Sequence, residues 1–349
     1  MIDNKRANVR STIQRLMDEG REAQDYIVPI GVEVSPVITF VNNWELMMNV
    51  NMTPFTINEH AMGQLAEKMN IPPYYLHGLA WGYDWQKQLA ATILNEHASW
   101  TKRQRILIRT VGTKVRGVLS DSYRRLNSVK ILTAFLEEAD RQEAVVADAW
   151  MTDTKIRAET ILPMPIVVPT NKNGDVVIFM GARFSTSDYG DGALDMRAFL
   201  LNGACLNGMV RESVMKKIHI GSRLHDNMEL SNHTYELDTL TTVSAIQDLT
   251  KSLFSRDAIM QKAIEIQEAS KIDVDFESEL RKLVKTGSFD KFDHERIQKI
   301  LMQNNPEDGM QGEATRWKFS QAITAHAREL EPRRSRELHE ISGLLMIPT

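Results

Sequence analysis

Cysteine and long apolar runs are scarce in this sequence, and each scarcity excludes a class of protein. Cys205 is the single cysteine, so an internal disulfide is excluded and a reducing compartment is expected. No stretch approaches the ~18 consecutive apolar residues that a membrane helix needs. The first twelve residues, MIDNKRANVRST, are charged where a signal peptide has its apolar core. We therefore expect a soluble, cytoplasmic protein without a membrane segment.

The short motifs of common catalytic sites are also missing. The chain has no phosphate-binding Gly-Lys-Ser/Thr loop, no GxGxxG, no HExxH and no paired CxxC. Cys205 lies in an apolar run without an adjacent base, so we interpret it as a buried structural residue. Asp188 and Asp191 could hold a divalent cation, but their segment lacks the calcium-loop pattern and is better interpreted as a polar turn. We predict no catalytic residue, metal ligand or cofactor.

One local block of positive charge stands out in a chain whose formal net charge is −4. Because the whole chain is acidic, any binding of anions must come from such a local patch. The block runs from Lys102 to Arg125 and contains a single acid, Asp121. Its basic residues are Lys102, Arg103, Arg105, Arg109, Lys114, Arg116, Arg124 and Arg125.

The basic block has the pattern of a β-hairpin. Apolar-rich runs flank Gly112-Thr113, a tight-turn signal. Alternate residues of a strand face the same way, so Arg105 and Arg109 share one face of the first strand, and Lys114 and Arg116 share one face of the second. The pattern predicts a one-sided cationic surface for phosphates, whose affinity should fall steeply with salt. The alternative is a solvated sheet face whose arginines pair with local acids.

A second basic stretch and several aromatic residues extend this hypothesis. Only Glu212 opposes the second stretch between Met196 and His225, whereas residues 226–308 are net negative. This segregation of charge favours an electrostatic groove, or an acidic tail that neutralises a basic sheet. The second stretch holds Arg197, Arg211, Lys216, Lys217, His219, Arg223 and His225. Aromatic residues near the two stretches, which could stack on bases or belong to the core, are Trp100, Tyr123, Phe184 and Tyr189.

The order of periodic segments predicts an α+β fold: a central antiparallel β-hairpin sheet backed by helices, with a helical C-terminal region. A helix is expected from Thr56, which would cap it with Glu59 in a capping box, and a second from Asp84 to His97, with Trp85, Leu89 and Ile93 on its apolar face. Further hairpin bends are expected at 152–154 and 171–175. The expected parts are an N-terminal segment (1–55), an α+β core with basic hairpins (56–225) and a helical region (226–349).

Several segments resemble a phage- and plasmid-borne family known as domain of unknown function 932. Residues 115–126, VRGVLSDSYRRL, resemble its "vRa-lSdrYr-iD" segment, and residues 201–208, LNGACLNG, resemble its "RlvCtNG" segment. Similar segments are GARFSTSDYG (181–190), IHIG (218–221) and TRWKFSQAIT (315–324). Leu201 and Gln321 depart from the usual arginine and asparagine of the family. The resemblance covers roughly residues 55 to 345.

This resemblance implies a role in recombination or replication, because the family looks distantly like phage single-strand annealing proteins of the Redβ, Erf and Sak type. The expected function is ATP-independent binding and annealing of single-stranded DNA, or RNA, by a homo-oligomeric ring or filament in a bacterial host cell. The expected contacts are the basic block, Lys216, Lys217 and His219, with Tyr123 stacking on bases. Alternatives are a metal-dependent nucleic-acid-processing enzyme that uses Asp121, Asp188, Asp191 or His219, and a phage protein that binds a host protein through its acidic helical end.

Overall fold

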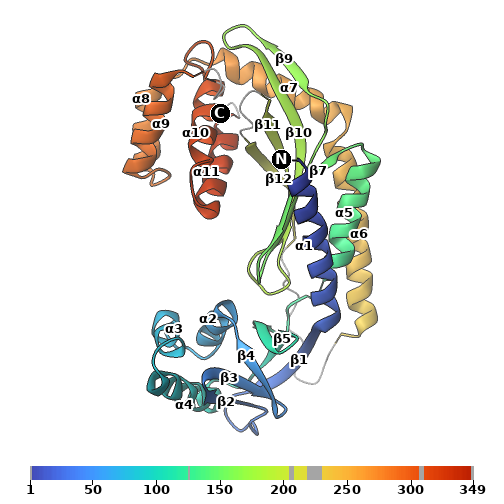
Figure 1. Cartoon of the computed structure of the whole chain (residues 1–349), viewed down its shortest axis with the longest axis vertical. Helices are drawn as coiled ribbons and strands as arrows, with labels where there is room; N and C mark the ends of the chain where they lie inside the picture. Colours follow the sequence, from blue (N-terminus) through green and yellow to red (C-terminus); the bar gives the residue numbers. More distant parts are fainter. Residues whose placement is uncertain (1, 125, 204–207, 218–229, 306–309, 347–349) are drawn as a thin grey trace.

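The computed structural model describes residues 2–124, 126–203, 208–217, 230–305 and 310–346. They form a mixed α+β fold with two β-sheets and a series of C-terminal helices, which confirms the expected fold class. Figure 1 shows two units along the long axis of the molecule, each built around one sheet. Within the described residues, none of the helices has the length and apolar character of a membrane span.

The first unit contains a six-stranded sheet with the order β1-β5-β6-β4-β3-β2. Strands β5 and β6 are the predicted basic hairpin, and Gly112 between them has a φ of 55°, as the tight turn requires. The boundary expected near residue 55 falls inside β4, so this sheet uses residues from both sides of it. The strands are β1 (Ala23–Ile30), β2 (Ile38–Asn43), β3 (Glu45–Val50), β4 (Thr53–Ile57), β5 (Gln104–Val111) and β6 (Lys114–Ser120).

Three helices complete this unit: α2 (Glu59–Lys68), α3 (Pro73–Ala80) and α4 (Asp84–Trp100). Helices α2 and α4 pack on the sheet, and α3 packs against both of them. The cap of α2 is Asn58, whose Oδ1 accepts a hydrogen bond from the backbone N–H of Ala61 at 2.7 Å, and not Thr56 as expected. Helix α3 is not among the expected helices, because a pair such as Pro72-Pro73 ordinarily interrupts helical structure. Pro73 instead occupies the first helical turn, where a missing N–H costs no hydrogen bond.

The second unit is built on an antiparallel sheet with the order β12-β11-β10-β8-β7, and β9 pairs with β10. The expected bends at 152–154 and 171–175 join β7 to β8 and β9 to β10. The strands are β7 (Val145–Met151), β8 (Ile156–Ile161), β9 (Ile166–Thr170), β10 (Gly174–Thr186), β11 (Leu194–Asn202) and β12 (Gly208–Lys217).

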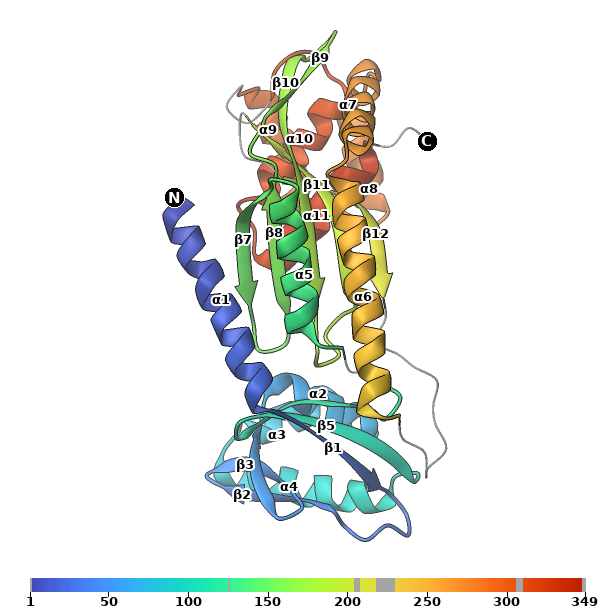
Figure 2. The same ribbon diagram turned by 90° about the vertical axis from the view of Figure 1, so that its right-hand side faces the viewer.

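Helices lie on both sides of this second sheet. α5 (Ser128–Arg141) and α6 (Asn232–Leu253) cover one face, and α1 (Ile2–Glu22) packs beside β7 (Figure 2). Phe135 of α5 and Phe184 of β10 stack in the core between this helix and the sheet. On the opposite side of the sheet, α11 packs against β12 (Figure 1). The remaining helices are α7 (Arg256–Lys271), α8 (Phe276–Lys285), α9 (Lys291–Gln303), α10 (Arg316–Ala327) and α11 (Pro332–Leu345).

Candidate nucleic-acid interface

Arg109, at the centre of the predicted cationic face, is buried between the two units. Only 7% of its surface is exposed. Its Nε and Nη2 donate to the two carboxylate oxygens of Asp25 at 2.8 and 3.0 Å, and its Nη1 donates to the carbonyl oxygen of Asp188 at 2.7 Å. Burial disfavours the charged guanidinium, but the Asp25 carboxylate holds the pKa of Arg109 above its usual value. The prediction that Arg109 lies on an open face is therefore wrong.

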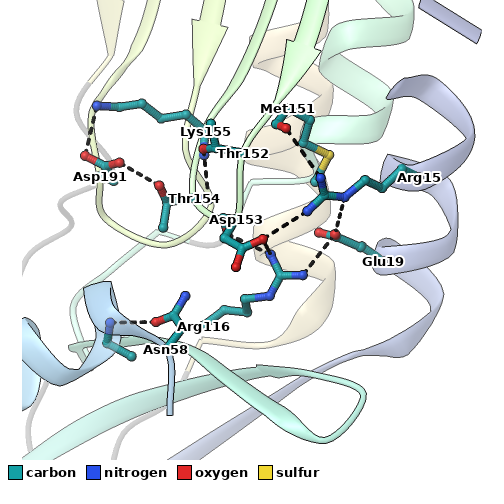
Figure 3. A network of polar contacts seen from close by, with 11 residues as sticks. Arg15, Glu19, Asn58, Arg116, Met151, Thr152, Asp153, Thr154, Lys155 and Asp191 are labelled. Carbon is teal, nitrogen blue, oxygen red and sulfur yellow. Dashed lines mark hydrogen bonds and ion pairs between the residues drawn. The ribbon is translucent and has the colours of Figure 1, made fainter. Parts of the chain in front are cut away.

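Arg116, on the neighbouring strand, is likewise buried at the junction, with 8% exposure. Figure 3 shows its side chain between α1 and the β7–β8 turn, where Nη2 donates to Glu19 Oε1 at 2.9 Å and Nη1 to the carbonyl oxygen of Asp153 at 2.8 Å. Arg15 shares the same Glu19 oxygen at 2.8 Å. The prediction of an open face is wrong for Arg116 too, because this arginine joins β6 to two elements of the second unit.

Other members of the basic block also have protein partners. Tyr123 is buried and its hydroxyl donates to the carbonyl oxygen of Ser187 at 2.9 Å, so its ring is not open to a nucleic-acid base as predicted. Burial raises the pKa of this hydroxyl. Arg105 Nε lies 3.7 Å from an Asp121 oxygen, and Arg124 Nη1 lies 3.3 Å from an Asp238 oxygen. The pairing of arginines with acids matches the alternative interpretation, except that Arg109 and Arg116 are enclosed and not solvated.

The exposed cations of the block do not form one surface. Lys102 and Arg103 precede β5, whereas Lys114 follows the turn at the far end of the same hairpin. In the second stretch, the strand register pairs Lys216 with Asp195 and Lys217 with Leu194. Arg125, His219 and Cys205 lie outside the described residues. The predicted contacts are thus distributed over several places.

The candidate metal ligands have other partners. Asp188 accepts a hydrogen bond from Ser128 Oγ at 2.6 Å. Asp191 accepts one from Thr154 Oγ1 at 2.6 Å and pairs with Lys155 at 2.9 Å. Among the residues that the structure describes, no group of three or more His, Cys, Asp or Glu side chains is arranged to hold a metal ion.

A surface that the charge pattern did not reveal lies on the first unit, where large aromatic side chains are exposed. Trp44 is 86% exposed, Tyr83 78% and Trp85 65%. Monomeric proteins seldom expose aromatic residues in groups, and such groups mark binding sites. The sequence held a signal, because these residues crowd into a short part of the chain. We define the aromatic surface as Trp44, Trp81, Tyr83 and Trp85, which lie on the β2–β3 turn and around the start of α4.

Hydrogen bonds join the two chain segments that carry most of the aromatic surface. Lys87 Nζ, on α4, donates to the carbonyl oxygen of Trp44 at 2.7 Å, and Asn42 Nδ2 donates to Asp84 Oδ1 at 2.8 Å. These bonds fix the β2–β3 turn, which carries Trp44, against the start of α4, which carries Trp85. Trp81 stacks on His77 with ring centroids 4.6 Å apart.

A cavity of about 430 Å³ opens beside the aromatic surface. Trp81, Lys87 and Lys114 line it from the first unit. Asp153, from the β7–β8 turn, borders it from the second unit, and Glu45 and Glu59 also line it. The cavity therefore combines one ring of the aromatic surface with two lysines and three acids, so the formal charge of its lining is close to zero and slightly negative.

The backbone of Trp44 adds evidence that its side chain serves binding. Its φ is 66°, in the left-handed region that favours glycine and asparagine. A side chain that is 86% exposed gains little from burial to offset this cost. Unfavourable backbone and an exposed ring at one position are features that folding stability does not explain.

Replacing Trp44 by asparagine is expected to raise the free energy of unfolding by about 1 kcal/mol, because asparagine tolerates this backbone. Urea denaturation of the Trp44→Asn variant and the parent measures the difference. The control is Trp85→Asn, which exchanges an exposed tryptophan in a helix and should not stabilise. A loss of stability in Trp44→Asn would mean that the ring contributes to folding.

Comparisons of the chain with protein families, curated proteins and solved structures give no match. The resemblance of the sequence segments to the phage and plasmid family therefore remains a prediction.

Proposed function

We propose that this protein binds single-stranded nucleic acid by stacking unpaired bases on the aromatic surface. The observation that carries the proposal is the exposure of Trp44, Tyr83 and Trp85 around the start of α4. Stacking of a base on an aromatic side chain is worth roughly 1–3 kcal/mol and needs no particular base. Several exposed rings on one unit are therefore enough for useful affinity without sequence specificity.

The phosphate contacts of this proposal are few. Lys87 and Lys114 line the cavity beside Trp81, whereas Arg109 and Arg116 are held in the junction by acids. A strand lying across the aromatic surface would thus gain affinity mainly from its bases. Binding of this kind differs from the arginine-lined groove that the charge pattern predicts.

Strand annealing and assembly into rings or filaments belong to the same proposal. Annealing needs strands brought together reversibly, and it requires no nucleophile or nucleotide hydrolysis. An assembly would place several aromatic surfaces along one strand, and this multivalency raises the overall affinity without any new kind of contact. The expected role in phage or mobile-element recombination is part of the proposal and depends on this binding.

A protein partner is the second candidate for the aromatic surface. Tryptophan and tyrosine are enriched at the centres of protein interfaces, where charged residues are depleted. The nearly balanced charge of the cavity beside Trp81 favours this candidate. Binding of oligonucleotides discriminates between the two, because a surface built for a protein would bind no single strand.

The salt dependence of binding tests the proposal. Each phosphate contact on a single strand contributes about −0.7 to the slope of log affinity against log salt concentration. Contacts from Lys87 and Lys114 alone predict a slope of about −1.4, whereas contacts from seven of the eight basic residues in the basic block would give about −5. Fluorescence anisotropy with a labelled oligonucleotide measures the slope, and a duplex of the same sequence is the control, expected to bind more weakly. A slope near −5, or equal affinity for the duplex, would contradict base stacking.

A further inference from the structure

Three arginines lie side by side on the face of the second sheet that is turned away from α5 and α6. Arg157 is on β8, Arg183 on β10 and Arg197 on β11. The strand register places Arg183 directly opposite Arg197 on one side and opposite Glu159 on the other. Like charges in directly opposed positions destabilise a sheet. This arrangement therefore calls for compensation by anions.

The acids of the protein compensate these arginines only in part. Glu159 Oε1 accepts from Arg157 Nη2 at 2.6 Å and from Arg183 Nε at 2.7 Å, so two guanidinium groups share one carboxylate oxygen. Arg183 is 9% exposed, and within the described part of the chain its two terminal nitrogens have no hydrogen-bond acceptor. The two terminal nitrogens of this nearly buried guanidinium can therefore donate charge-assisted hydrogen bonds to a bound anion.

Arg197 is better compensated and lies nearer to solvent. Its Nε pairs with Asp195 at 2.5 Å and its Nη1 with Glu340, from α11, at 2.7 Å. Its side chain is about a quarter exposed. Arg197 therefore stands at the rim of the arginine cluster, where a charge can be removed with less effect on folding.

A cavity of about 230 Å³ opens onto these arginines. Its wall also carries Trp150, whose ring faces the Arg157 guanidinium at 5.9 Å. A water, with one heavy atom, occupies about 30 Å³ in the liquid. An inorganic phosphate has five heavy atoms, so at a similar volume per atom it leaves part of the cavity unfilled. Its basic residues, Lys155, Arg157, Arg183, Arg197 and Arg336, outnumber its acids, Asp191, Asp195 and Glu340.

The electrostatics of the cluster agree with an excess of positive charge. Burial lowers the pKa of Arg183 to about 10 against the opposing effect of Glu159, and Arg157 and Arg197 lower it further. His339, on α11, has a pKa lowered to about 3 by burial and by Arg183, so its imidazole is neutral. Its Nε2 is buried and has no hydrogen-bond partner among the described residues.

We propose that this cavity binds an organic phosphate, with the phosphate group on Arg183 and Arg197 and the organic part beside Trp150. Guanidinium groups bind phosphate oxygens through paired hydrogen bonds, and several of them together favour a doubly charged phosphate monoester over a single carboxylate. The aromatic ring and the remaining volume provide for the organic group. This site is independent of the aromatic surface on the first unit.

Isothermal titration calorimetry of the full chain tests the site with three probes: adenosine 5′-monophosphate, inorganic phosphate and adenosine. The monophosphate should bind at least as tightly as phosphate, and adenosine should not bind. Arg197→Gln, at the rim, should weaken binding of the monophosphate at least about tenfold, as expected for loss of a charged hydrogen-bond donor. Arg281→Gln, on the exposed surface of α8, is the matched control and should bind like the parent.

The outcomes are separable from those of the proposed function. Absence of monophosphate binding, equal binding of adenosine, or unchanged affinity in Arg197→Gln would overturn the site. Lys155→Gln provides a second rim variant should Arg197→Gln fold poorly, and it should also weaken binding. Trp85→Ala should leave monophosphate binding unchanged, because Trp85 lies on the first unit.

Discussion

Replacing Asp25 by alanine is expected to lower the free energy of unfolding by about 3–5 kcal/mol. Arg109 would then keep its charge in a buried position without the carboxylate that accepts from its Nε and Nη2. The remaining hydrogen bond to the Asp188 carbonyl oxygen does not neutralise it. Urea denaturation followed by circular dichroism measures the loss.

Two controls separate the uncompensated charge from a general effect of substitution. The double variant Asp25→Ala, Arg109→Met removes both charges and should recover much of the stability, because an apolar pair of similar volume replaces a buried ion pair at little cost. Asp18→Ala breaks the exposed pair with Arg21, and it should cost less than about 1 kcal/mol. Equal losses in Asp25→Ala and Asp18→Ala would contradict the structural role of Arg109.

Because Arg109 and Arg116 are buried, charge reversal at these two positions cannot test nucleic-acid binding. Charge reversal at both positions would place two glutamates beside Asp25, Glu19 and Asp153. Such a variant would lose the contacts that join the two units, so a loss of nucleic-acid binding would report a structural defect. Exposed positions of the aromatic surface and of the hairpin ends are the appropriate sites.

Local signals were sufficient to predict the hairpins and most helices. Gly112-Thr113 predicts the β5–β6 turn because only a few backbone conformations join two adjacent antiparallel strands. Alternation within β5 correctly placed Arg105 and Arg109 on one face. It could not reveal what covers that face, since Asp25 and Asp188 are distant in the sequence.

Helix α4 shows the same limit. The period of Trp85, Leu89 and Ile93 predicts a helix, and the helix is present. Its buried residues, however, are Ala90, Ala91 and Leu94, because small side chains allow α4 to pack closely on the first sheet. Trp85 and Leu89 are exposed, and Trp85 becomes part of the aromatic surface, whereas Ile93 is partly buried against the core of the first unit. The helix is therefore predicted correctly, but its apolar face only in part.

The arginine cluster could be predicted only with knowledge of the strand register, because the positions of the strands along the chain do not show which residues are paired. Arg157 and Arg183 are far apart in the sequence and belong to different hairpins. They meet at Glu159 because β8 pairs with β10. No charge pattern along the chain contains this pairing, so the second candidate site was visible only in the folded structure.

Replacing Trp81 and Trp85 together by alanine is expected to reduce the affinity for a single-stranded oligonucleotide by about 100-fold. Loss of two stacked bases costs roughly 2–6 kcal/mol, and each 1.4 kcal/mol is about tenfold in affinity. Trp85 is 65% exposed, and Trp81 is 48% exposed and stacked on His77, so the free energy of unfolding should fall only modestly. Urea denaturation of the variant verifies that the loss is one of binding.

Oligonucleotide affinity, measured by anisotropy at a single salt concentration in three proteins, tests the central claim most directly. The proteins are the parent, Trp81→Ala with Trp85→Ala, and Lys102→Gln with Arg103→Gln. We predict that the parent binds, that the tryptophan variant loses about 100-fold in affinity, and that the cation variant loses less than about tenfold. A parent that does not bind, or a cation variant weaker than the tryptophan variant, would contradict binding by the aromatic surface.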